Sequence, residues 1–191
     1  MLRAMADVFI TIVWIFGNSK ERSQKFIHYG LGQAKLQLEH RKADLQRREP
    51  LEGENDDLDA AEEWINQQRL MFLTEVNLGS WSGVTTRKMA EKGGCLDFYN
   101  YVYMPFSACV HSMWHHVAKY NLKQCQNVLH RFHSIPDVPT LPVDLNYFYL
   151  AAKYLQKTFA RFDEETGVSV YVPSAFDLVC EGIDALSVEG E

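Results

Sequence analysis

The chain has 191 residues, of which 47% are hydrophobic and 23% charged, a composition that excludes a wholly disordered protein. Its net charge of −6 at pH 7 excludes a protein that binds nucleic acid through a broadly basic surface. The four cysteines form no CxxC pair and no secretory signal precedes them, so we expect reduced thiols and a cytoplasmic location.

The first segment, residues 4–16, is nearly all apolar and predicts a buried helix over residues 2–16 that ends at Gly17. The segment is shorter than the roughly 20 residues that cross a bilayer and is interrupted by Asp7, so we expect no membrane association. The helix begins almost at the first methionine, so we expect the natural start to lie further upstream.

The next segments alternate between helical periodicity and polar breaks. Ser19 is predicted to cap a long basic helix that Pro50 closes, and the acidic segment after it is predicted to be an exposed loop. Gly93 and Gly94 are predicted to stop a short helix capped by Thr85 or Thr86. The predicted elements are a helix over residues 20–48, a loop over 49–59, a helix over 58–76, a loop over 77–83 and a helix up to residue 92.

Residues 95–120 have a helical pattern with Pro105 inside it, which predicts a kink or a restart just before the histidines. Residues 168–172 alternate, but five residues are too few to build a sheet. The remaining predicted elements are a helix over 122–132, a proline-rich loop over 133–142, a helix over 143–162 ended near Gly167, and a weak helix over 174–186. Together these patterns predict an all-α, single-domain bundle of about six to eight helices over residues 1–167, followed by a C-terminal tail over 168–191.

Three histidines fall within six residues, at positions 111, 115 and 116. His111 and His115 are four apart, a spacing that on one helix lets two imidazoles hold one metal ion. Ser112 stands where a zinc hydrolase would have its glutamate, and a third ligand would have to come from elsewhere. The sources considered are Glu75, Asp97, His130 and His133. The alternative is that His111 is a buried, hydrogen-bonded histidine, and we expect no metal and no other cofactor.

His111 is also chemically suited to general acid–base catalysis, because an imidazole exchanges protons near neutral pH. A phosphodiester-cleaving site would add a cation, and Arg3, Arg22, Arg87 and Arg131 are the suppliers considered. Arg3 and Asp7 form an i, i+4 pair, either a simple ion pair or a charged pair kept for function.

We expect one pocket where the first helix, the Trp81 loop and the His111 helix meet. The candidate catalytic residues are His111, Arg3, Asp7 and Arg87, and the candidate binding residues are Trp81, Ser107, Trp114 and His115.

Four features recur in order along the chain: Arg3 with Asp7, an Arg22…Phe26…Tyr29 pattern, a W-S-G loop followed by R-x-M-A-E (residues 81–91), and S-x-x-V-H-S (residues 107–112). Over residues 1–162 they resemble a bacterial and phage-borne family of all-helical domains of unknown function. That family is similar in layout to the HEPN superfamily, which includes ribonucleases of toxin and anti-phage systems. Those enzymes carry an arginine separated from the histidine by four to six intervening residues, and the corresponding positions 104–106 here are Met, Pro and Phe.

These observations favour a non-enzymatic helical module that binds a protein partner or itself, most simply as a dimer. Aromatic residues make up 13% of the chain, more than one small core hides, and aromatic side chains are favoured at interfaces. The alternative is a divergent, metal-independent ribonuclease that uses His111 with Arg3 or Arg87, although the net charge does not support RNA as a partner.

Overall fold

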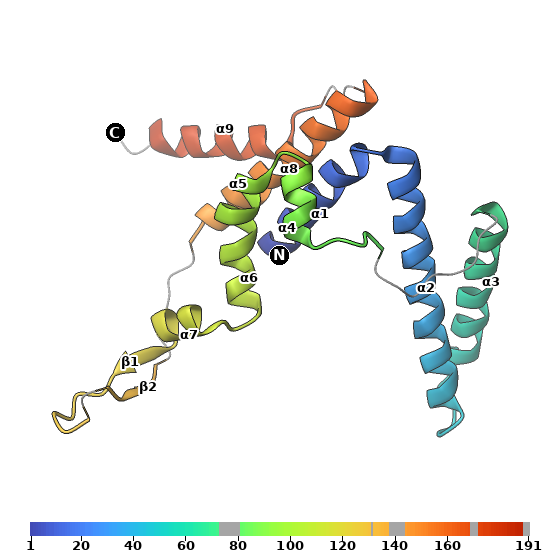
Figure 1. The fold of residues 1–191 in the computed structure, drawn as a ribbon, viewed down its shortest axis with the longest axis horizontal. Helices are drawn as coiled ribbons and strands as arrows, with labels where there is room; N and C mark the ends of the chain where they lie inside the picture. Colours follow the sequence, from blue (N-terminus) through green and yellow to red (C-terminus); the bar gives the residue numbers. More distant parts are fainter. Residues whose placement is uncertain (73–80, 131, 138–143, 169–171, 189–191) are drawn as a thin grey trace. The chain divides into compact units, whose positions relative to one another are not determined.

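The computed structural model describes residues 1–72, 81–130, 132–137, 144–168 and 172–188 (Figure 1). Helices dominate these residues and the strands form one short hairpin, so the predicted all-α class is confirmed. The helices are α1 (Leu2–Phe16), α2 (Ser19–Leu45), α3 (Glu54–Phe72), α4 (Thr86–Lys92), α5 (Leu96–Phe98), α6 (Met104–Val110), α7 (Trp114–Tyr120), α8 (Asn146–Thr166) and α9 (Ala175–Val188), with a π-helical turn over Tyr99–Tyr103. The strands are β1 (Leu122–Gln124) and β2 (Ser134–Pro136).

The described residues form two compact units, one made of residues 1–16 and 86–191 and the other of residues 17–85. The predicted domain boundary after residue 167 stays a prediction. Parts of several predicted elements, at residues 73–80, 131, 138–143, 169–171 and 189–191, lie outside the described residues.

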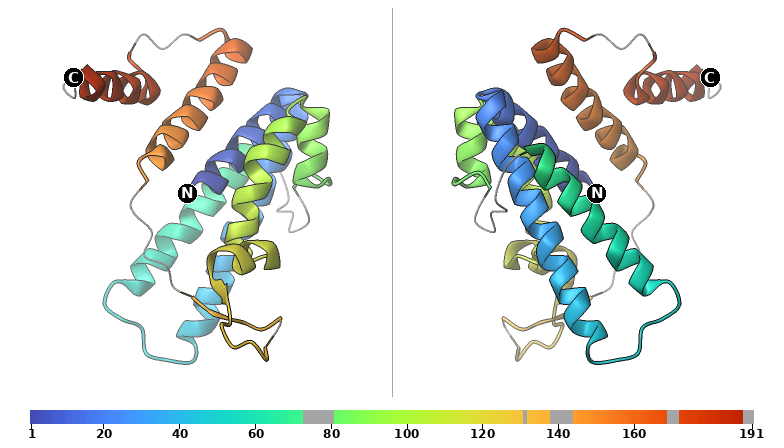
Figure 2. Two further views of the ribbon diagram at one scale, coloured as in Figure 1. Left: turned by 90° about the vertical axis from the view of Figure 1, so that its left-hand side faces the viewer. Right: turned by 90° about the vertical axis from the view of Figure 1, so that its right-hand side faces the viewer.

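In the unit of residues 17–85, α2 and α3 lie side by side as a helical hairpin (Figure 2). Its core is formed by Leu38, Leu58 and Ile65, which are all buried. The helix prediction for α2 is confirmed, but Ser19 is the first helical residue and does not cap the helix. Asn18 takes the cap position, and its side-chain amide donates to Glu21 at 2.8 Å.

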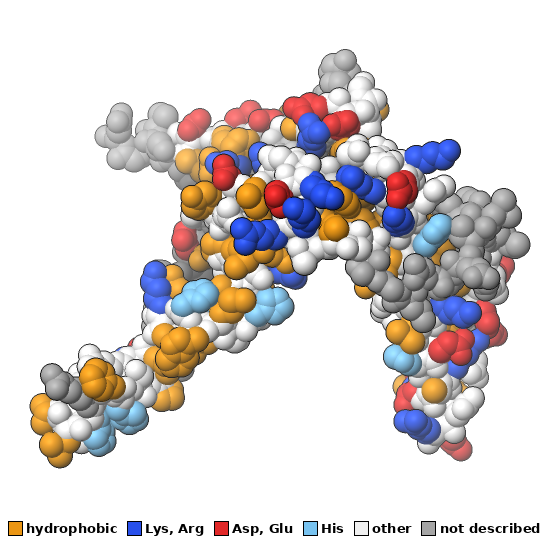
Figure 3. Space-filling view, in the orientation of Figure 1, with side chains coloured by type: hydrophobic (Ala, Val, Ile, Leu, Met, Phe, Trp, Pro, Cys, Tyr) orange, Lys and Arg blue, Asp and Glu red, His pale blue; other side chains and the backbone are white. Residues whose placement is uncertain are grey.

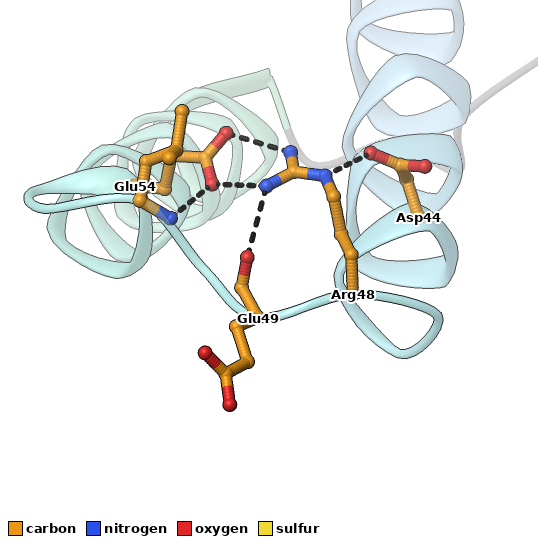
Figure 4. Close-up of polar contacts among 5 residues, drawn as sticks. Asp44, Arg48, Glu49 and Glu54 are labelled. Atoms are coloured by element: carbon orange, nitrogen blue, oxygen red, sulfur yellow. Dashed lines mark hydrogen bonds and ion pairs between the residues drawn. The ribbon is translucent and has the colours of Figure 1, made fainter.

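The acidic segment after α2 is shorter than predicted, because α3 already begins at Glu54. Glu54, Asp56 and Asp57 fill the first turn of α3, where negative side chains interact favourably with the helix dipole. Arg48, which follows α2, forms an ion pair with Glu54 at the start of α3 (Figure 4). A second ion pair joins Lys42 to Glu62 at 2.7 Å.

In the unit of residues 1–16 and 86–191, α1 packs against α8 and α4. Its predicted burial is confirmed, since Ala6, Ile10 and Trp14 are inaccessible or nearly so. The predicted stop of α4 is also confirmed: Gly94 has φ of +70°, a backbone conformation that glycine adopts readily. Aromatic contacts extend this core, because the Phe98 ring lies 4.7 Å from that of Phe9 and 5.4 Å from that of Tyr154, between ring centroids.

The predicted long helix over residues 95–120 is interrupted twice. The π-helical turn of Tyr99–Tyr103 leads directly into α6, whose first turn contains Pro105, so the helical hydrogen-bond pattern changes just before the proline. The predicted kink or restart at Pro105 stays a prediction. The second interruption follows α6, where Ser112 has φ of +48° and Met113 is extended. The sequence pattern did not indicate this second break.

The predicted helix over residues 122–132 is wrong, because these residues enter an antiparallel hairpin in which Leu122 pairs with Pro136 and Gln124 with Ser134. The apolar side chains of Val128, Leu129 and Phe132 are 93%, 86% and 92% exposed. A short helix needs a packing surface for its apolar side, and the described residues provide none there.

After the hairpin, α8 and α9 confirm the two helices predicted for the C-terminal part, and Gly167, with φ of +69°, ends α8 as predicted. The two helices pack together, with the rings of Tyr149 and Phe176 5.4 Å apart. Among the described helices, none is both long enough and apolar enough to cross a membrane.

Candidate functional site

Arg3 is the best-connected of the predicted site residues. Its Nη2 donates a hydrogen bond to the Tyr103 hydroxyl at 2.8 Å and lies 3.9 Å from the Asp7 carboxylate. The guanidinium also lies over the Tyr103 ring, 5.2 Å from its centroid, and Tyr99 stacks on that ring at 5.1 Å. The predicted pair with Asp7 is therefore present, and Arg3 additionally ties α1 to the π-helical turn. The buried Nε of Arg3 has no acceptor among the described residues.

His111 lies at the end of α6, not inside a helix. Its amide donates to the carbonyl of buried Ser107 at 3.0 Å, while its side chain is exposed. The expectation of a buried His111 is therefore wrong. His115 lies beyond the break, on α7, so the two histidines do not stack on one helix as predicted. The α6–α7 break thus removes the geometric argument for a metal ion held by this pair.

The other predicted residues are dispersed. Trp114 opens α7 with 72% of its surface exposed, and Arg87 is exposed on α4. Trp81 belongs to the unit of residues 17–85, where its ring packs edge-on against Phe26 at 5.1 Å. The pocket expected to join Trp81 to His111 stays a prediction, and so do the roles assigned to Arg3, Asp7, Arg87, Ser107, Trp114 and His115.

Two of the residues considered as further metal ligands, His130 and His133, lie on the loop of the β1–β2 hairpin. Figure 3 shows histidine and hydrophobic side chains together on the surface over α6, α7 and this hairpin. Asp97 is exposed on the short helix α5, and Glu75 lies outside the described residues.

The sequence reasoning missed an apolar surface on α8. Phe148, Leu155, Phe159 and Phe162 are spaced by seven, four and three residues, so they lie on one face of the helix. Their exposed fractions are 66%, 37%, 58% and 43%. We call these four residues the α8 stripe. The seven-residue spacing was visible in the sequence, but it could not be distinguished there from a face buried in the core.

α8 also packs against α1 and α9. Tyr154 and Thr158 are buried on another side of the helix, and burial raises the pKa of the Tyr154 hydroxyl. Ala152, which has the spacing of the stripe itself, is buried as well. The Lys157 ammonium lies over the Phe9 ring at 5.1 Å, which places this side of α8 against α1. At its C-terminal end the stripe contacts α1, where the Phe162 and Phe16 rings are 5.9 Å apart. The stripe is therefore an exposed apolar surface on a helix that also packs against α1 and α9.

The four cysteines form no disulfide with one another. Burial raises the pKa of the Cys95 thiol, although nearby Lys157 and Arg161 act in the opposite direction. A raised pKa keeps the thiol protonated at neutral pH and therefore disfavours Cys95 as a nucleophile.

No curated protein and no solved structure is significantly similar to this chain. A family model described as a family of unknown function, DUF5677, matches residues 1–127. The match includes α1 with Arg3 and Asp7, the R-x-M-A-E segment and the S-x-x-V-H-S segment, and it ends within the hairpin. Because the match covers well over half of its length, the chain belongs to the DUF5677 family of unknown function.

Proposed function

We propose that this chain is a self-associating helical module that forms a homodimer through antiparallel pairing of its α8 stripes. The observation that supports it is an exposed apolar face on a helix that packs against α1 and α9 on other sides. Exposed apolar surfaces of this kind mark protein interaction sites more often than isolated exposed residues do. Binding of a different protein through the same stripe is the alternative.

The spacing of the stripe favours a second copy. Phe148, Leu155 and Phe162 repeat every seven residues, the repeat with which two helices pack knobs into holes. A two-fold axis at Leu155 places Phe148 of one chain opposite Phe162 of the other over a stripe about 21 Å long. The same axis places Phe159 opposite Ala151, a large side chain against a small one. The stripe is thus complementary to itself.

The charges of α8 are compatible with this pairing. The acidic end, Asp163 to Glu165, falls opposite residues 145–147, which are Leu, Asn and Tyr. Lys157 lies over the Phe9 ring on the side that faces α1, so it is directed away from the paired helix. The pairing therefore forces no like charges together along the stripe.

The first test is the mass of the protein in solution across a concentration series, measured by light scattering or sedimentation. We expect a dimer for the wild type and a monomer for Phe159→Glu, since a carboxylate in the centre of an apolar interface is strongly unfavourable. Tyr101→Glu is the matched control, because Tyr101 is also a highly exposed aromatic residue but lies outside α8. A wild type that stays monomeric, or a dimer that survives Phe159→Glu, contradicts the proposal.

The second test addresses the register. A cysteine at the two-fold axis meets its own copy, so Leu155→Cys should form an intermolecular disulfide under mild oxidation. Phe148→Cys alone should not, because its copy lies at the far end of the stripe and disulfides need Cα atoms within about 7 Å. A mixture of Phe148→Cys and Phe162→Cys chains should again cross-link. Efficient self-cross-linking of Phe148→Cys would instead indicate a parallel pair and would exclude the proposed register.

A further inference from the structure

We infer that Cys125, His130 and His133 form a zinc site that fixes the loop of the β1–β2 hairpin. Each of the three residues offers one ligand atom, and these atoms all lie within 4.8 Å of one another. The site is distinct from the His111 and His115 pair considered from the sequence. It is also independent of the α8 stripe.

The hairpin register brings two of the ligands together. In the β1–β2 pairing, Gln124 is opposite Ser134, so the next pair along the ladder is Cys125 and His133. This pair is present, because the Cys125 amide donates to the His133 carbonyl at 2.9 Å. Directly opposed residues of an antiparallel pair have Cβ atoms about 5 Å apart, within reach of a shared metal ion.

The loop between these two residues returns the third ligand to the same place. The His130 amide donates to the Asn127 carbonyl at 2.9 Å, and the His133 amide donates to the His130 carbonyl at 3.1 Å. The Asn127 side chain also accepts from the Leu129 amide at 3.0 Å, an arrangement typical of a tight turn. Two successive turns therefore fold His130 back onto the end of the ladder.

The ligand geometry is close to that of zinc. Tetrahedral zinc with Zn–S of about 2.3 Å and Zn–N of about 2.0–2.1 Å separates sulfur from nitrogen by roughly 3.6 Å. The Cys125 Sγ and the His130 Nδ1 are 3.7 Å apart. The His130 and His133 rings lie 5.2 Å apart between centroids, so small side-chain rotations complete the set. One edge of the coordination polyhedron is thus already formed by the protein alone.

The ligand types select the metal. One thiolate and two imidazoles suit zinc better than magnesium or calcium, which prefer oxygen ligands. Three protein ligands leave the fourth tetrahedral position for water or an external donor atom. His130 and His133 are exposed and Cys125 is partly so, which leaves that position accessible from solvent.

The surroundings explain what the ion would contribute. The loop side chains Val128, Leu129 and Phe132 are almost fully exposed, so burial of apolar surface does not hold this loop in place. The Lys123–Asp137 ion pair at 2.8 Å lies at the other end of the hairpin and is exposed, a setting in which ion pairs stabilise little. A metal ion bound by residues 125, 130 and 133 would close the loop at three points.

Cobalt is the most direct probe, because Co²⁺ replaces zinc and gives a thiolate charge-transfer band that reports a Co–S bond. The full chain, with any affinity tag removed, is titrated with Co²⁺ in a buffer that contains a phosphine reductant to keep the thiols reduced. We expect an equimolar end point with tetrahedral visible bands and the thiolate band, both displaced by Zn²⁺. Azide should change the visible bands if the fourth position is open.

The controls use the exposed thiol and imidazole outside the cluster. Cys125→Ser should abolish the thiolate band and His130→Ala should weaken binding at least tenfold, whereas Cys109→Ser and His115→Ala should leave the titration unchanged. Limited proteolysis gives a second readout: Zn²⁺ should slow cleavage within residues 126–132 in the wild type but not in Cys125→Ser. The inference is overturned if no band saturates, if Cys109→Ser removes it equally, or if Zn²⁺ protects both proteins alike.

Discussion

Arg48 and Glu54 are joined by two parallel hydrogen bonds, from Nη1 at 2.7 Å and from Nη2 at 2.8 Å, across the turn between α2 and α3 (Figure 4). Arg48 also donates from Nε to Asp44 at 2.9 Å, and Glu54 also accepts from the Leu51 amide at 2.7 Å. The hydrogen bonds from Arg48 and from the Leu51 amide lower the pKa of Glu54 from 4.5 to about 2. One ionised carboxylate thus closes the turn of this helical hairpin.

Because of this low pKa, the stability of the α2–α3 hairpin depends on pH in the acidic range. Because the folded pKa of Glu54 is lower than its ordinary value, its stabilising contribution is complete above about pH 4.5 and is lost as the pH falls toward 2. We expect Glu54→Gln to lower the free energy of unfolding at pH 7 and to flatten its decline between pH 4.5 and 2. Denaturant unfolding followed by circular dichroism at several pH values measures both effects. Glu52→Gln, an exposed carboxylate in the same turn, is the control, and equal pH dependence in wild type and Glu54→Gln would refute the prediction.

The contact between Arg3 and Tyr103 predicts a stability change that separates hydrogen bonding from packing. Tyr103→Phe removes the acceptor of the 2.8 Å hydrogen bond but keeps the ring under the guanidinium and against Tyr99. We expect a loss of about 1 kcal/mol in the free energy of unfolding. Tyr99→Phe keeps the stacked rings without removing a described hydrogen bond, so it should leave the free energy of unfolding nearly unchanged. If the two variants lose equal stability, the hydrogen bond is not the stabilising contact.

Much of the fold was predictable because the relevant signals are local. The helix of residues 2–16 was predicted with its observed bounds, since its continuous apolar composition and the Gly17-Asn18 break act within the segment itself. Gly94 and Gly167 ended helices as predicted, because both occupy left-handed backbone conformations that glycine tolerates.

The errors have a different physical origin. Residues 122–132 contain apolar side chains at helical spacing, but whether a short segment becomes a helix or a strand depends on which distant segment pairs with it, here residues 134–136. The break at Ser112 was missed because neither glycine nor proline marks it. The missed break separates His111 from His115, and the missed hairpin brings Cys125 close to His130 and His133, so the sequence pattern favoured the wrong group of histidines.

Two glycines predict opposite responses to the same substitution. A Cβ at Gly30, within α2, meets no atom within 4 Å, so Gly30→Ala should stabilise the protein by about 0.5–1 kcal/mol through its better helix propensity. A Cβ at Gly93 would lie 2.7 Å from the Cγ1 of buried Val13. We expect Gly93→Ala to destabilise by about 1–3 kcal/mol, measured by denaturant unfolding.

The clash itself is tested in a second background. Val13→Ala removes the atom that the new Cβ would meet, so the cost of Gly93→Ala should be smaller in Val13→Ala than in the wild type. An unchanged cost would locate the problem in the backbone of the turn and not in the contact between α1 and α4.

The alternative of a ribonuclease that uses His111 is tested by an RNA cleavage assay. We expect no cleavage of RNA by the purified protein in EDTA, in the wild type or in His111→Ala, because the side chain of His111 is exposed and no arginine stands at positions 104–106, where the ribonuclease pattern considered from the sequence would place one. The Nη2 of Arg3, the cation considered from the sequence, is hydrogen-bonded to Tyr103. His115→Ala, a change at an equally exposed histidine, controls for nonspecific effects of removing an imidazole. Cleavage that His111→Ala abolishes and His115→Ala preserves would make His111 catalytic. Self-association through the α8 stripe would then not be the main function of the protein.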